Sequence, residues 1–350
     1  MASRKLIDHQ RSHAARIQRE LATATHAPAD TRHVEPADTT ALAPRGDDTL
    51  QMLLLCAHPA LSDASRVALT LRAVAGQSTR QIASGFLVPE ATMAQRISRA
   101  KATLRAAEAR FEAPTAPELP TRLHAVRHVL YLTFNEGYTT SSGMTLIDTD
   151  LASEAIRLAE RLHRAIPDAT ESSGLLALML LTHARTPART NDRGDLVPLA
   201  EQDRTLWDRD LLASGTTLIE QALSAGPTGP FQLQAAIAAV HGEAATAEAT
   251  DWLQITMLYR MLDRLAPSPT VTLNLAIAVG MAHGPAAGLA ALTPLLVRAD
   301  QQRNHRVHAA HAHLLEQAGN TEAAEGAYRL AARLTDSIPE QRYLNRQAGH

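Results

Sequence analysis

The chain has 350 residues, a formal net charge of −2 and a single cysteine. Its length allows roughly two or three domains, and one cysteine excludes a disulfide framework and cysteine-based zinc sites. Hydrophobic residues make up 45% of the chain but aromatic residues only 3%, which favours packed helices over sheets. No apolar run approaches the roughly 18 residues of a membrane span, and the amino-terminal segment lacks the apolar core of a secretory signal. We therefore expect a cytoplasmic, all-α protein without a membrane partner.

The first 48 residues do not predict a packed domain. Residues 1–22 form a basic amphipathic segment that is long enough for one helix at most. Residues 23–48 are rich in Thr, Ala, Pro and Asp, have no hydrophobic period, and predict a flexible linker. An apolar helix is then expected over residues 49–61, TLQMLLLCAHPAL. Ser62 has the position of an N-cap for the helix that follows.

Residues 65–110 have the pattern of a helix-turn-helix. An apolar helix ends at Gly76, a short helix is expected over residues 78–87, and a tight turn at 88–90 leads into a basic second helix. A support helix, a sharp turn and a helix that enters the major groove have this order. The segment holds 8 Lys and Arg and 2 Asp and Glu in a nearly neutral chain. Positive charge is therefore concentrated where phosphate binding would require it.

The second helix, over ATMAQRISRAKATLR, divides into two faces. Side chains at helical spacing are expected to pack on the preceding helices: Met93, Ile97, Ala100 and Leu104. Outward side chains near its amino-terminal part are candidates for contacts with base edges: Thr92, Gln95, Arg96 and Arg99. Other polar side chains are candidates for phosphate contacts: Lys101 and Arg105 further along this helix, and Thr79 and Arg80 at the start of the support helix. The alternative is a solvated basic face on an ordinary helical hairpin.

The sequence after three closely spaced prolines at positions 114, 117 and 120 predicts a separate helical domain over residues 121–350. Two stretches suggest helical repeats of about 34 residues, the tetratricopeptide length. The clearest one has small and apolar residues at the spacing of that motif: Ala312, Leu315, Gly319, Ala324, Tyr328 and Ala331. Residues 182–210 interrupt the array with turns. Concave repeat surfaces commonly bind partners, so a regulatory protein is a possible partner of this domain.

The helix-turn-helix resembles region 4 of extracytoplasmic-function RNA polymerase sigma factors. The shared positions are Arg66 to Leu71, Gly76, Ile82-Ala83, Val88 to Glu90, Thr92, Arg99-Ala100-Lys101 and Leu104-Arg105. The string FLVPEATMAQRISRAK is similar to one subgroup that carries a long tetratricopeptide-like extension. Later strings also match that extension in order: HVLYLTFNEGYTTSSG, LVPLAEQDRTLWDRDLL, FQLQAAIAAVHGEA and DWLQITMLYRMLDRLAPSPTVTLNLAIAV. The resemblance covers most of the chain from Leu50 onward.

This resemblance implies a DNA-binding domain over residues 49–112 that brings core RNA polymerase to promoters. The second helix would contact the −35 element through Thr92, Gln95, Arg96, Arg99 and Arg105. An apolar surface would contact the polymerase β-flap through Leu53, Leu54, Leu55, Val67 and Leu71. No catalysis and no cofactor are implied. The support helix has Gln81 where the family often has Glu, which leaves one of its contacts in doubt.

A complete family member carries region 2, which binds the polymerase clamp and melts the −10 element, before region 4. Residues 1–22 resemble only the last turns of region 2. One explanation is a start assigned too late or a truncated gene. The other is a short regulator, or a helical-repeat scaffold, that lacks autonomous initiation activity.

Two groups of side chains suggest other chemistry. His305, His308, His311 and His313 are close in sequence, which allows either a metal site or a histidine-rich helix surface. A metal at these residues would favour an enzyme over a binding protein. His124 and His128 are one turn apart without the HExxH pattern of zinc proteases.

Acidic residues also gather at two places. Asp148 and Asp150 follow Gly137. We expect Gly137 to end a helix in the left-handed conformation and the two acids to begin the next helix. The alternative is a carboxylate site. Around Trp207 we expect an ion-pair network that pins the indole, and a peptide-binding groove is the alternative.

Overall fold

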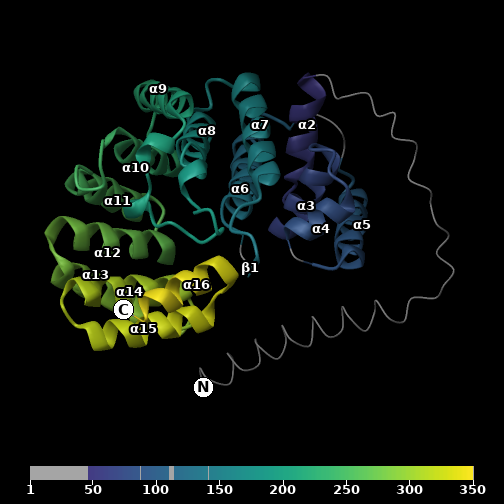
Figure 1. The fold of residues 1–350 in the computed structure, drawn as a ribbon. Helices are drawn as coiled ribbons and strands as arrows, with labels where there is room; N and C mark the ends of the chain where they lie inside the picture. The colour runs from purple at the N-terminus through teal and green to yellow at the C-terminus, as the bar shows by residue number, and fades with distance from the viewer. Residues whose placement is uncertain (1–45, 87, 110–113, 141, 350) are drawn as a thin grey trace, which may run out of the picture. The chain divides into compact units, whose positions relative to one another are not determined.

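The computed structural model describes residues 46–86, 88–109, 114–140 and 142–349. The remnant expected at residues 1–22 and the linker up to residue 45 lie outside these ranges. The described part is predominantly helical, which confirms the all-α prediction. Its strands, β1 (Ser142–Gly143) and β2 (Asp336–Ser337), form a two-residue parallel pair. Figure 1 follows the helices in chain order from purple to yellow.

The first helices build the helix-turn-helix. Their bounds are α2 (Gly46–Cys56), α3 (Asp63–Ala73), α4 (Thr79–Gly85) and α5 (Glu90–Ala106). Ser62 caps α3 as predicted, since its side chain accepts a hydrogen bond from the Ser65 N–H. Helix α2 begins at Gly46, three residues before the expected start, so the predicted linker does not extend to residue 48.

The remaining helices follow one another with short connections. Their bounds are α6 (Leu119–Tyr138), α7 (Thr149–Ala165), α8 (Thr170–His183), α9 (Arg209–Ala225), α10 (Pro230–Glu243), α11 (Trp252–Leu265), α12 (Pro269–His283), α13 (Pro285–Leu296), α14 (His305–Gln317), α15 (Thr321–Leu334) and α16 (Ile338–Gln347). Residues 184–208 interrupt this series with three short 3₁₀ helices, η1 (Thr186–Ala188), η2 (Leu199–Glu201) and η3 (Arg204–Leu206).

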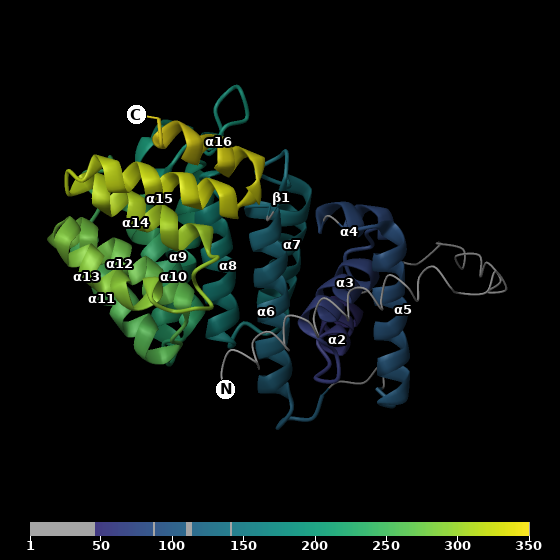
Figure 2. The ribbon, with the colours of Figure 1, turned by 90° about the horizontal axis from the view of Figure 1, so that it is seen from below.

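Helices α6 to α15 are packed as successive pairs. Each helix contacts the next, and α6 with α8, α8 with α10 and α12 with α14 contact each other across the pairs. The figures show this stacking from two directions (Figures 1 and 2). Asn and Asp side chains cap several of the helices, among them Asp148 on α7 and Asn320 on α15. Gly319 has a φ of 79°, in the left-handed region, as the turn between α14 and α15 requires.

The helix-turn-helix shares one hydrophobic core with the helices that follow it. Helix α3 packs on α5 and on α6, and α2 packs on α6 and α7. The same core contains Leu71 of α3, Leu130 of α6 and Leu158 of α7, each completely buried. Helices α6 and α7 therefore lie directly beside α2 and α3 (Figure 2).

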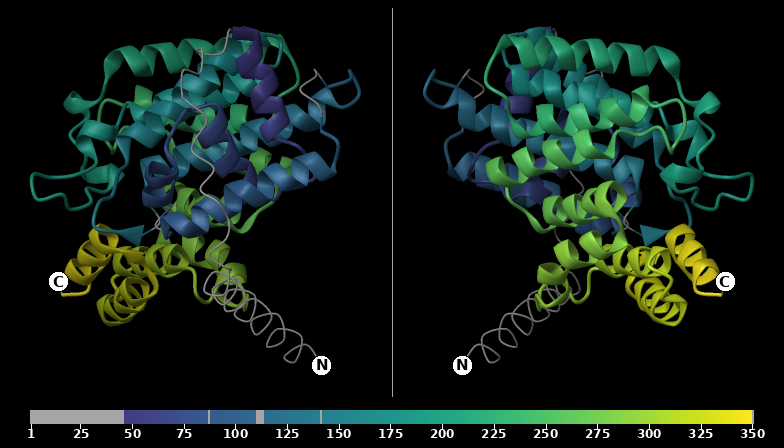
Figure 3. Two further views of the ribbon diagram at one scale, coloured as in Figure 1. Left: turned by 90° about the vertical axis from the view of Figure 1, so that its right-hand side faces the viewer. Right: turned by 90° about the vertical axis from the view of Figure 1, so that its left-hand side faces the viewer.

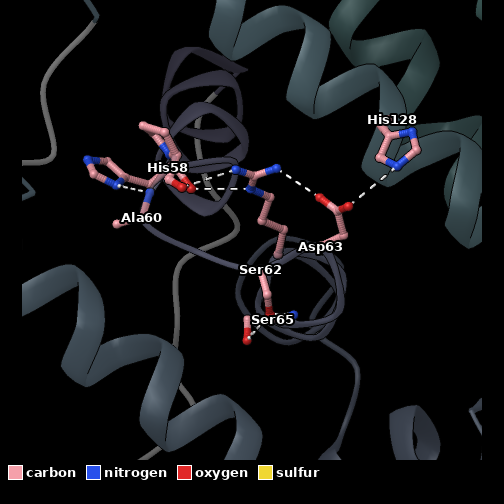
Figure 4. Close-up of polar contacts among 8 residues, drawn as sticks. His58, Ala60, Ser62, Asp63, Ser65 and His128 are labelled. Atoms are coloured by element: carbon pink, nitrogen blue, oxygen red, sulfur yellow. Dashed lines mark hydrogen bonds and ion pairs between the residues drawn. The ribbon is translucent and has the colours of Figure 1, made fainter. Parts of the chain in front are cut away.

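Polar contacts reinforce this junction. The Arg161 guanidinium donates a hydrogen bond of 2.9 Å to the Thr49 hydroxyl, and Thr49 is buried. His128 of α6 lies 3.7 Å from the carboxylate of Asp63 at the start of α3, and Figure 4 shows this pair beside Ser62 and Ser65. The hydrophobic core thus continues across the prolines that were expected to separate two domains.

Gly137 corrects one prediction. It lies inside α6 and not in a left-handed cap, because positive φ values among the described glycines occur at Gly76, Gly194, Gly284 and Gly319. A Cβ at Gly137 would be 2.4 Å from the backbone nitrogen of Ala152 in α7. Gly137 therefore allows the close approach of α6 and α7.

Gly137→Ala is expected to lower the free energy of unfolding by about 1–3 kcal/mol, since the new methyl group meets backbone that cannot move aside. Gly326→Ala is the matched control, because Gly326 is an exposed residue of α15 with no atom within 4 Å of its missing Cβ. That change should raise stability by about 0.5–1 kcal/mol. Urea denaturation followed by circular dichroism measures both, and equal effects would contradict the close-approach explanation.

Candidate nucleic-acid interface

Helix α5 has one buried face, as its period predicts. Met93 and Ala100 are 1% exposed and Ile97 is 6% exposed. They pack against α3 and α4, which fixes the rotation of α5 about its axis. Leu104 is only partly buried and packs against the edge of the same core.

The opposite face of α5 is polar and accessible. Thr92, Arg99, Lys101 and Arg105 are exposed, while Gln95 and Arg96 are half-buried. No Asp or Glu occurs between residues 91 and 107, so Glu90 at its amino-terminal end is the only acid within α5 that offsets these cations. The structure thus keeps the predicted base-contact and phosphate-contact residues of α5 out of its fully buried face.

The support helix α4 begins with a reciprocal cap. The Gln81 side-chain oxygen accepts a hydrogen bond from the Ser78 N–H at 2.8 Å, and the Ser78 hydroxyl accepts one from the Gln81 N–H at 3.2 Å. This is a capping box, which accepts Gln or Glu at its third helical position. Gln81 therefore makes the same hydrogen bond to the Ser78 N–H that a Glu at this position would make.

Two candidate phosphate ligands lie at this start of α4. Thr79 is half-buried, and the side chain of Arg80 is 85% exposed. The Arg80 guanidinium is 3.5 Å from a carboxylate oxygen of Glu90, the first residue of α5. This exposed pair links the two helices across the turn, and an exposed ion pair of this kind contributes little stability.

The predicted polymerase-contact side chains are mostly buried. Leu53, Leu54, Val67 and Leu71 are at most 4% exposed and belong to the core shared with α6 and α7. Direct contact with a partner through these four side chains is incompatible with that burial. Leu55 alone of the five is half-buried, so it retains accessible surface.

A hollow beside Leu55 was not predicted from the sequence. Its volume is about 240 Å³, and its lining includes Leu54, Leu55, His58 and Arg122. Burial, together with the nearby charges of Arg122 and Arg66, lowers the pKa of His58. The His58 carbonyl accepts a hydrogen bond from the Arg66 guanidinium, in the region that Figure 4 shows. Residues far apart in sequence line this hollow, so no local pattern could have indicated it.

The start of α7 lies beside the support helix. A second cavity of about 160 Å³ is lined by Gln81 and Ile82 of α4 and by Asp148 and Asp150 at the start of α7. Asp148 accepts a hydrogen bond from the Leu151 N–H, which confirms its predicted role at a helix start. The two carboxylates therefore add negative charge next to the helix-turn-helix.

The histidine-rich segment forms polar contacts within α14 and with its neighbours. His305 lies 3.1 Å from Glu340, and the His308 ring contacts the Gln302 carbonyl at 2.8 Å. Across the described residues, no group of three or more His, Cys, Asp or Glu side chains is arranged to hold a metal ion.

The side chain of Trp207 is held in place by burial and by a cation–π contact, and not by ion pairs. The indole is 2% exposed, and the guanidinium of Arg204 lies 4.7 Å from the ring centroid. Arg204 donates hydrogen bonds to the carbonyls of His241 and Ala244. The neighbouring carboxylates cap helices instead of pairing with arginines: Asp203 caps η3 and Asp208 caps α9. The predicted ion-pair network is thus replaced by a cation–π contact and helix caps.

Comparisons with known proteins agree with this geometry. Residues 51–104 match the model of the family described as sigma-70, region 4, and residues 122–223 match a family of unknown function, DUF6596. An uncharacterized protein of Rhizobium meliloti (strain 1021) is 44% identical over 321 residues, which cover 92% of this chain and 75% of that protein. The chain belongs to the same family as this relative, and its residues 51–104 are a sigma-70 region 4 domain. No solved structure matches.

The sigma-70 match begins within α2, includes all of α3 and α4, and ends within α5. Region 4 is a helix-turn-helix domain, so the comparison and the structure give the same fold for this segment. Among the described residues no helix has the length and hydrophobicity that crossing a membrane requires.

Loss of the capping box should weaken the helix-turn-helix. Gln81→Ala removes the acceptor for the Ser78 N–H and is expected to lower the free energy of unfolding by about 1 kcal/mol. Gln81→Glu restores an acceptor of the same reach and is expected to remain close to wild type. Chemical denaturation of the full chain measures both, and a Glu variant as unstable as the Ala variant would contradict the cap.

His241 should make folding depend on pH. Burial, with the charges of Arg185 and Arg204, lowers its pKa from 6.5 to about 3. The unfolded chain therefore binds a proton below about pH 6.5 that the folded chain does not bind. The contribution of His241 to the free energy of unfolding is complete above that pH and falls by about 1.4 kcal/mol per pH unit as the pH decreases toward 3.

His241→Phe should remove this dependence, because it preserves an aromatic ring beside Trp252, 5.2 Å away in the wild type. Denaturant midpoints at several pH values between 7.5 and 4.5 measure the difference between the two proteins. Parallel pH profiles for wild type and variant would show that His241 does not titrate in this way.

Proposed function

We propose that this protein is an extracytoplasmic-function-type sigma factor that binds the −35 element of promoters through α5 and recruits core RNA polymerase. Region 4 occupies the segment from α2 to α5, corresponding to the domain expected at residues 49–112. Helices α6 to α16 form the tetratricopeptide-like extension expected at residues 121–350. The protein acts by binding, without covalent chemistry or a cofactor.

The accessible face of α5 carries this proposal. Its buried side chains fix the helix with Thr92, Gln95, Arg96 and Arg99 on the open side, and an α-helix fits the major groove with such residues on base edges. Arg pairs with guanine through two hydrogen bonds, which gives sequence preference.

Phosphate contacts would hold α5 in register. Lys101 and Arg105 lie closer to the carboxyl end of α5 and remain exposed. Arg80 supplies a further cation at the start of α4, where its charge, and not the capped helix amides, would attract a phosphate. Asp148 and Asp150 beside α4 add opposing charge at this edge, so α5 is the stronger determinant of binding.

Contact with the polymerase β-flap would use the surface that remains near Leu55. The hollow lined by Leu54, Leu55 and His58 offers apolar and polar groups at the end of α2. The other predicted contact residues would support this surface from inside the core. A regulatory protein at the extension is a further proposed partner, as concave repeat surfaces commonly bind proteins.

Two substitutions test the division of roles along α5. Arg96→Ala is expected to cost about 1–3 kcal/mol on the preferred duplex and to relax base preference at one position. Lys101→Ala is expected to weaken all duplexes alike and to reduce the slope of binding against salt by about one. Gel-shift titrations at several salt concentrations, on −35 variants selected from a random pool, measure both effects.

Arg193→Ala is the control, because Arg193 is an exposed arginine in the loop between α8 and α9. Equal effects of the two α5 substitutions on every duplex would refute the division of roles. Absence of salt-dependent DNA binding in the wild type would refute the proposed function and favour a helical-repeat scaffold.

A further inference from the structure

Helix α11 exposes an apolar stripe. Its large hydrophobic side chains Leu253, Met257, Met261 and Leu265 are 57%, 58%, 43% and 51% exposed. They recur every four residues, so they follow one side of the helix along its whole length. Single exposed hydrophobic residues are ordinary on a protein surface, whereas a continuous stripe indicates an interaction site.

The stripe is not part of the core of the repeat array. Helix α11 packs on α10 and α12 through its other side, where Ile255, Thr256 and Leu262 are at most 2% exposed. The helix lies at the margin of the array in Figures 1 and 2, and the green segment that contains it faces the viewer in the right-hand panel of Figure 3. A partner can therefore approach the stripe without displacing another helix.

We propose that this stripe binds a second copy of the chain, with the two α11 helices packed antiparallel across a two-fold axis. The order of the stripe, Leu-Met-Met-Leu, is the same in both directions. In an antiparallel pair, Leu253 lies opposite Leu265 of the other copy and Met257 lies opposite Met261. A two-fold interface requires such a self-complementary surface.

The charges at the ends of α11 support this orientation. Arg264 is exposed near its carboxyl end, and Glu248 and Asp251 are exposed near its amino end. An antiparallel pair places Arg264 of one copy near these acids of the other, at both ends of the contact, whereas Arg260 lies close to the two-fold axis. A parallel pair would place like charges together, which opposes association.

The same charges disfavour the basic residues 1–22 as the occupant of the stripe. That segment has five Lys and Arg and two Asp and Glu. Its positive charge would face Arg260 and Arg264 beside the apolar side chains. A second copy therefore matches the apolar pattern of α11 and the opposite charges at its two ends.

The mass of the full chain in solution tests the association. Sedimentation equilibrium over a wide range of concentration should show twice the chain mass of 37.6 kDa. Replacing the central pair, Met257→Glu with Met261→Glu, should weaken the dimer by about 30-fold or more, since charges would meet at the centre of the contact. Glu is a good helix former, so these exposed positions should fold normally.

Val297→Glu is the matched control, because Val297 is 73% exposed and lies outside α11. It should leave the mass unchanged. A monomer at all concentrations would overturn the proposal. A dimer that survives the double substitution, or that Val297→Glu disrupts equally, would also overturn it.

Cysteine cross-linking tests the orientation. The natural Cys56 is 1% exposed, so an added cysteine at the surface reports on its own position. A mixture of Met257→Cys and Met261→Cys chains should form a mixed disulfide under mild oxidation, since the proposed register places these positions opposite each other. A mixture of Leu253→Cys and Met257→Cys chains should form much less. The reverse preference would exclude the antiparallel pair.

Discussion

The apolar contact of α2 and α3 with α6 and α7 is the interaction on which the rest of the described structure depends. A helix-turn-helix of this size buries only a modest core by itself. Here Leu53 and Leu71 share a core with Val126, Leu130 and Leu158 from the following helices. Region 4 and the extension should therefore be stable as one unit, and the rotation of α5 is set from inside that unit.

This contact has a consequence for partners. The side of α2 and α3 that holds Leu53 and Leu71 is already covered within the chain. Hydrogen bonds also hold α6 and α7 against α2, among them Arg161 with Thr49 and Arg122 with the Leu54 carbonyl. A polymerase surface must bind at the remaining edge near Leu55 or displace α6 and α7, and displacement would expose a large apolar area to water.

The opposite side of the unit remains open. Helix α5 turns Met93 and Ile97 into the core, which directs Thr92 and Lys101 to solvent. The core contact and the proposed DNA contact thus use different sides of the same helices. Binding at α5 does not require the extension to move, while acidic residues at the start of α7 lie near enough to α4 to oppose phosphates there.

The sequence by itself determined the local features of this protein. The helical class, the N-caps at Ser62 and Asp148 and the two faces of α5 follow from residue types within a few positions of one another, because caps and helical periods are local. Only the tertiary structure decided which apolar side chains remained accessible. Leu53 and Met257 are both apolar residues of helices, yet Leu53 is buried in the core shared with α6 and α7 and Met257 faces solvent. Gly137 is likewise explained by Ala152 of another helix, because the close approach of two helices cannot be inferred from one of them alone.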